Sequence, residues 1–184
     1  MKTKKEIIWG KTKSRVDQIT DALGKKIDRK IRESVTAMMI FDFSTSASCE
    51  GHITKLEKRL LRIKKESRGI PIPNFLEPFI EIYAPAPKNW KNDEKKKKKW
   101  TKDNLAQRAR IEKILKEFYQ KRKTSNDAKL VLENIGIFGA FRIHNKGGGK
   151  VGKLPLPKQK EALTIFQKEF RDFAKFSKKK YFSE

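Results

Sequence analysis

The chain has 184 residues and a formal net charge of +24, so it is long enough for one domain with a hydrophobic core. It has no apolar run of the roughly 18–20 residues that span a bilayer, its N-terminus lacks the apolar stretch of a secretory signal, and its one cysteine excludes an intramolecular disulfide framework. We therefore expect a cytoplasmic protein without a membrane partner, whose excess positive charge predicts binding to nucleic acid.

Two helices are expected in the first part of the chain. Residues 1–13 are predicted to form a basic N-terminal arm, followed by a helix that Ser14 caps and that ends near Leu23. Apolar residues at three- and four-residue spacing predict a second helix over Ile27–Phe41.

The pentapeptide Ser48-Cys49-Glu50-Gly51-His52 combines the only cysteine, one of two histidines and a carboxylate. If a basic helix over about residues 53–68 follows, Cys49 is a candidate nucleophile, with a pKa lowered by the helix N-terminus and with Glu50 and His52 as acid–base partners. A metal site shared with His144, an anion site at the helix start, and a buried structural cysteine remain open alternatives. Metal is the weakest of these, because two histidines and one cysteine barely reach three strong ligands. No motif in the sequence identifies a cofactor.

Strands are expected in the middle of the chain. Residues that alternate between the two faces predict a strand over Phe79–Tyr83. A hairpin is predicted over 129–145, in which Arg142 and His144 share a face. If Glu81 lies on a strand adjacent to Arg142, the two form an ion pair at the floor of a pocket. The residues predicted to line one depression are Ser48, Cys49, Glu50, His52, Glu81, Arg142 and His144.

Lysine-rich segments at 86–100 and 146–156 are predicted to be exposed loops, the first leading into a helix that Thr101 caps. A terminal helix begins near Pro157 and buries a stripe of phenylalanines. The cations expected to contact nucleic acid are Lys95, Lys96, Lys97, Lys98, Lys99, Lys146, Lys150, Lys153, Arg59 and Arg62.

These elements predict a single α+β domain over residues 1–184, with four or five helices packed on a small, mainly antiparallel sheet. Sequence motifs for nucleotide-binding loops, dinucleotide binding, paired CxxC metal sites, serine hydrolases and zinc proteases are not found.

The order of motifs resembles an uncharacterised family of small bacterial proteins with an S-C-E-G-H motif and a G-I-F-G-A-F-R segment, here Ser48–His52 and Gly136–Arg142. The resemblance covers most of the chain and implies a shared site but no chemistry. The pentapeptide is also similar, at Ser48, Cys49 and Gly51, to the S-S-C-S-G-R element of wybutosine-synthesis tRNA methyltransferases, with His52 in place of the arginine. This second likeness is too short to transfer a function and is only compatible with a role directed at RNA.

The leading hypothesis is a basic protein that binds nucleic acid, RNA rather than DNA, around a polar pocket. One alternative is an enzyme that modifies nucleic acid with Cys49 and His52. Another is a structural accessory protein of a ribonucleoprotein or phage particle.

Overall fold

The computed structural model describes residues 2–21, 23–54 and 74–183. Over these ranges the predicted α+β fold is confirmed, with five helices, a four-stranded antiparallel sheet of order β1-β4-β6-β5 and a two-stranded sheet of β2 and β3. In chain order the elements are α1 (Lys4–Gln18), α2 (Arg32–Ile40), β1 (Thr45–Cys49), β2 (His52–Ile53), β3 (Phe75–Leu76), β4 (Phe79–Ile82), α4 (Glu94–Tyr119), β5 (Leu130–Ile135), β6 (Ala140–Asn145), α5 (Gly148–Val151) and α6 (Leu156–Ser183).

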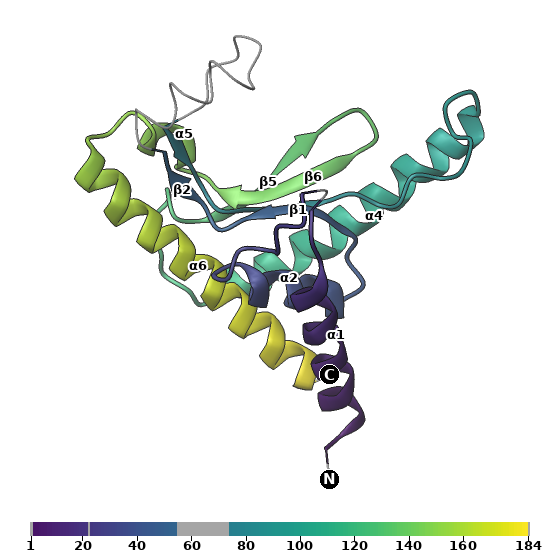
Figure 1. Ribbon diagram of the computed structural model, residues 1–184, viewed down its shortest axis with the longest axis horizontal. Helices are drawn as coiled ribbons and strands as arrows, with labels where there is room; N and C mark the ends of the chain where they lie inside the picture. The colour runs from purple at the N-terminus through teal and green to yellow at the C-terminus, as the bar shows by residue number, and fades with distance from the viewer. Residues whose placement is uncertain (1, 22, 55–73, 184) are drawn as a thin grey trace.

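Helices α2, α4 and α6 lie on one side of the four-stranded sheet, and α1 packs against α2 (Figure 1). The N-terminal turns of α4 extend beyond the end of the sheet, whereas the two chain ends lie near each other at the far side of the helical layer (Figure 1). The sheet therefore separates two surfaces, one packed on helices and one carrying polar side chains.

The central strands have the alternation that the sequence predicts. Ile80 and Ile82 of β4 are fully buried, while Glu81 between them lies on the opposite face. The predicted hairpin is also confirmed, because β5 and β6 pair from Leu130↔Asn145 to Ile135↔Ala140. Apolar and polar side chains thus alternate along these strands, and the apolar ones determine which face of the sheet packs against the helices.

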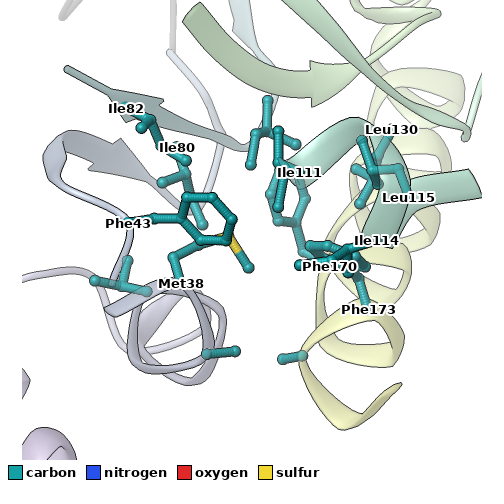
Figure 2. Packing of buried hydrophobic residues seen from close by; sticks show 14 of the residues in the cluster. Met38, Phe43, Ile80, Ile82, Ile111, Ile114, Leu115, Leu130, Phe170 and Phe173 are labelled. Carbon is teal, nitrogen blue, oxygen red and sulfur yellow. The ribbon is translucent and has the colours of Figure 1, made fainter. Parts of the chain in front are cut away.

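The core is built where three helices meet the buried face of the sheet. Figure 2 shows Met38 of α2, Ile111 of α4 and Phe170 of α6 around Ile80 of β4. All four are at most 1% exposed. The predicted phenylalanine stripe of the terminal helix is confirmed as buried: Phe170 and Phe173 belong to this core, and Phe166 belongs to a second buried cluster with Phe75 and Val151.

The first two helices differ in extent from the prediction. Helix α1 begins at Lys4, not after Ser14, because Thr3 and Glu6 form a capping box, so the basic arm is mostly helical. Its buried residues are only Trp9 and Val16, which explains why the apolar pattern is weak. Helix α2 is shorter than Ile27–Phe41, because the chain turns before Ile31.

The lysine-rich segments also differ from the predicted loops. Asp93, not Thr101, caps α4 by accepting a hydrogen bond from the Lys96 N–H (3.0 Å), so all five consecutive lysines are helical. The second segment contains the short helix α5. The predicted basic helix over about 53–68, with Arg59 and Arg62, lies outside the described residues apart from its first two positions, and Ile53 belongs to β2.

Candidate functional site

The pentapeptide forms a strand, a turn and a second strand. β1 ends at Cys49, Glu50 and Gly51 make the turn, and β2 begins at His52. The expected helix N-terminus directly behind Cys49 is therefore wrong, and with it the basis for a dipole-activated thiolate or an anion site at that position.

Cys49 is a buried thiol that is 8% exposed. Its Sγ atom lies 3.5 Å from Nδ1 of His52 and accepts a hydrogen bond from the Gly51 N–H at 3.4 Å. Burial raises the pKa of Cys49, and the Gly51 N–H only partly offsets this effect. The predicted lowering of the Cys49 pKa is wrong, because burial outweighs the neighbouring donors.

We expect Cys49 to react slowly with iodoacetamide in the folded protein at about pH 8, because a raised pKa keeps the sulfur protonated and burial limits access. In denaturant the rate should reach that of a free cysteine peptide. Mass spectrometry of the alkylated protein over time would measure both rates, and folded-state alkylation as fast as that of the peptide would contradict the buried, structural interpretation.

Glu50 connects the turn to distant parts of the chain. Its side chain accepts a hydrogen bond from the Lys30 N–H at 2.9 Å, and its carbonyl oxygen accepts one from Nε2 of Gln167 in α6, also at 2.9 Å. Lys30 Nζ donates to Oε1 of the same Gln167 (2.9 Å). These bonds use the polar groups of Glu50 to join the segment before α2 to α6, which is a structural role.

A second polar cluster lies on the sheet face opposite the core. Glu81 and Arg142 are register partners on β4 and β6, and Nη2 of Arg142 lies 2.6 Å from Oε1 of Glu81. The guanidinium group also lies over the Phe79 ring, 4.4 Å from its centroid. The predicted ion pair on adjacent strands is confirmed, and it holds Arg142 flat on the sheet.

His144 belongs to this second cluster through two carboxylates. Its Nδ1 lies 3.4 Å from Oε1 of Glu77, and its Nε2 lies 3.8 Å from Oε2 of Glu133. Burial alone would raise the pKa of Glu77, but His144 and the backbone hold it below its usual value. The Glu77 carboxylate packs so closely on Gly148 that a Cβ atom there would collide with it.

Sequence reasoning missed Glu77, because it lies in the two-residue connection between β3 and β4 and outside any alternating pattern. Nothing in the local sequence places it beside His144, which is contributed by a distant strand.

The two clusters share one sheet face but do not converge. Cys49 is the register partner of Phe79, and Phe79 is the partner of His144, so Phe79 separates the two. Glu81 and Arg142 occupy the next row. Since adjacent strands are about 4.8 Å apart, Cys49 and His144 lie two strand spacings from each other.

Ser48 lies elsewhere, on the free edge of β1. With Thr45, Ser46 and Ala47 it lines a cavity of about 330 Å³ whose other wall is formed by residues between 19 and 35. Within the ranges that the structure describes, no group of three or more His, Cys, Asp or Glu residues is arranged to hold a metal ion.

The six lysines in the N-terminal part of α4, between residues 95 and 102, divide into two kinds. Lys96 pairs with Asp93 (3.5 Å) and Lys97 pairs with Glu94 (2.6 Å). The other four are exposed, and among the described residues none of them has an acidic partner. We call these four the lysine face: Lys95, Lys98, Lys99 and Lys102.

The lysine face is a single surface. Its residues follow the spacing i, i+3, i+4 and i+7, so they lie within an arc of about 100° on the helix. Trp100, Asn104 and Ile111 form the buried side of α4, so the lysine face is directed away from the core. It forms a row of unpaired positive charge on the part of α4 that extends beyond the sheet (Figure 1).

A second group of predicted cations surrounds α5. Lys146 donates to Oδ1 of Asn126 at 3.1 Å, Lys150 lies 3.7 Å from Asp127, and Lys153 is exposed. Two of these three lysines are thus held by neighbouring side chains.

Comparisons with protein-family models, with curated proteins and with solved structures each find no match to the chain. None of the helices within the described ranges is long and apolar enough to cross a membrane.

Proposed function

We propose that this protein binds nucleic acid, RNA in preference to DNA, through the lysine face of α4. The observation that carries the proposal is the set of four exposed lysines on one arc of one helix, without acidic partners among the described residues. Their positions recur about every 5–6 Å along the helix axis, which suits contact with successive phosphates of a polynucleotide.

The net charge of +24 supports the same proposal, because it attracts a polyanion over long range. The proposed setting is the cytoplasm, whose reducing conditions suit the free thiol of Cys49. An enzyme that uses Cys49 has less support, since the thiol is buried and its pKa is raised. The hydrogen bonds of Glu50 favour a structural role for the pentapeptide.

The test is a quadruple variant in which the lysine face is changed to glutamine. We expect its affinity for RNA to fall and its plot of log affinity against log salt to flatten by about 3, since each lost phosphate contact removes about 0.7–0.9 from the slope. Fluorescence anisotropy at about 50 and 200 mM salt would measure the affinity and its salt dependence. The same measurement with RNA and DNA of one sequence would test the preference for RNA.

A matched control removes the same charge from another surface, by changing Lys2, Lys4, Lys11 and Lys13 to glutamine. All four residues are exposed. Lys4, Lys11 and Lys13 belong to α1, and Lys2 lies just before it. Equal losses in the two quadruple variants would mean that net charge alone drives binding, and the lysine face would not be the site.

A further inference from the structure

A cluster of aromatic side chains lies at the base of the projecting part of α4. Trp100 is stacked on Tyr83 (ring centroids 4.8 Å apart, planes at 25°) and on Phe138 (4.6 Å, 23°). Trp90 packs against Trp100 and Phe138, with both centroid distances at 5.1 Å. We call Tyr83, Trp90, Trp100 and Phe138 the aromatic patch.

Buried hydrogen bonds fix the rings of the aromatic patch in place. Trp100 donates its Nε1–H to the Ala84 carbonyl oxygen at 2.6 Å. Asn104, which is fully buried, accepts a hydrogen bond from the Ala84 N–H (2.7 Å) and donates to the Phe138 carbonyl oxygen (2.9 Å). One asparagine thus joins the segment after β4, helix α4 and the tip of the β5–β6 hairpin, so the rings are preorganised.

Three rings of the aromatic patch remain partly accessible. Trp100 is 3% exposed, whereas Tyr83, Trp90 and Phe138 are half-buried. Trp100 stacks on both Tyr83 and Phe138, so its own ring is covered while theirs keep part of their surface. Next to Phe138, the side chain of Ile137 is 84% exposed at the hairpin tip.

The surroundings of the patch are positively charged. Lys88 and Lys91 flank Trp90, and both are exposed without an acidic partner in the described ranges. The lysine face continues along the same helix that supplies Trp100. Rings beside unpaired lysines are the combination that proteins use for unpaired nucleotides, because bases stack on the rings while the cations contact phosphates.

A second aromatic cluster in the molecule shows the contrast. There Lys178 lies over Trp9 (5.0 Å to the centroid) and Lys5 lies over Tyr181 (5.7 Å), so the protein's own cations cover these rings. Among the described residues, no cation lies over a ring of the aromatic patch. No cation of the described residues therefore competes with an external planar group for the accessible part of Tyr83, Trp90 and Phe138.

We infer that the partner is a single-stranded nucleic acid, whose unpaired bases stack on Tyr83, Trp90 and Phe138 while its phosphates lie on Lys88, Lys91 and the lysine face. A duplex cannot do this, because its bases are already stacked on one another. The inference rests on the proposed function and adds the class of substrate and the residues that select it.

The experiment compares a labelled single-stranded oligouridylate of about 12 nucleotides with an RNA duplex of the same length. Phe138→Leu and Trp90→Leu should each weaken single-strand binding about 5- to 100-fold, and leave duplex binding within about twofold. Phe182→Leu is the matched control, because Phe182 is 37% exposed and belongs to the covered cluster beside Trp9. It should change neither affinity.

A second measurement leaves the patch intact, in case a ring substitution disturbs α4. In a Trp9→Phe background the remaining tryptophans are Trp90 and Trp100, and the single strand should quench their emission while the duplex should not. Equal affinities for the single strand and the duplex, together with absent quenching, would overturn the inference. The proposed function would still stand if the lysine-face variant bound RNA more weakly than the unmodified protein. Absence of any RNA binding by the unmodified protein would overturn both.

Discussion

Replacement of Glu169 by alanine is expected to lower the free energy of unfolding by about 3–5 kcal/mol. Glu169 of α6 is 3% exposed and binds Arg122 through both oxygens, at 3.1 and 2.8 Å. Its Oε1 also accepts a hydrogen bond from the Tyr119 hydroxyl at 3.0 Å, and that hydroxyl oxygen accepts one from the Leu130 N–H at 2.8 Å. Alanine would leave these groups without the acceptor that joins α4, α6 and β5.

Burial raises the pKa of Tyr119, with a further contribution from the adjacent Glu169, so the phenol stays neutral and donates to Glu169. Arg122 keeps one partner in the variant, because Asp172 lies 2.7 Å from its Nη2. The loss should therefore fall toward the lower end of the range.

Urea unfolding followed by circular dichroism would measure the change. The control is Glu161→Ala on the same helix, where the exposed pair with Lys158 contributes little and the expected change is within about 0.5 kcal/mol. A loss below about 1 kcal/mol for Glu169→Ala would contradict the argument.

Replacement of Gly51 by alanine is expected to cost about 3 kcal/mol of stability. Gly51 has φ +77°, a left-handed conformation that other residues adopt only with strain. A Cβ atom would also lie 2.7 Å from both Cδ and N of Pro78 and 2.8 Å from Cδ1 of Leu163. The backbone of Pro78 cannot move aside without disturbing β4, which begins at the next residue.

The matched control for this change is Gly10→Ala in helix α1. A Cβ atom at Gly10 meets nothing within 4 Å, and alanine is the better helix former, so stability should rise by about 0.5–1 kcal/mol. Thermal unfolding of the two variants should thus shift in opposite directions. A Gly51→Ala protein as stable as the parent would show that the turn of the pentapeptide is not constrained by its neighbours.

Sequence patterns predicted the elements whose two faces differ most. In strand β4 and the β5–β6 hairpin, successive side chains alternate between the core and a polar face, and this alternation can be recognised in the sequence. The Glu81–Arg142 pair was predicted from it. Helix α6 has a stripe of buried phenylalanines at helical spacing.

Other elements depend on partners that a local pattern does not contain. The small residues of β1 carry no strong strand preference, and their extended conformation is set by pairing with β4. The start of α1 had a local signal in Thr3 and Glu6, but the helix buries so little apolar surface that its periodicity is faint.

The same distinction applies to the candidate site. The reactive residue types of the pentapeptide were visible, but whether Cys49 is exposed depends on how β1 and β2 pack, and the structure buries it. The aromatic patch brings together residues from four separate segments, and three of these segments are joined by Asn104, a residue that no motif marks. The resemblance to the S-C-E-G-H family stays a prediction.

The contact between the first and last helices constrains how the chain matures during synthesis. The ring of Trp9 packs on Tyr181 and Phe182, with centroids 6.3 and 6.0 Å apart. Tyr181 and Phe182 are synthesised more than 170 residues after Trp9. Helix α1 therefore leaves the ribosome long before its aromatic neighbours have been synthesised. Until α6 has been synthesised, the Trp9 side of α1 remains exposed to solvent. The packing of α1 can therefore be completed only when translation has reached the end of α6.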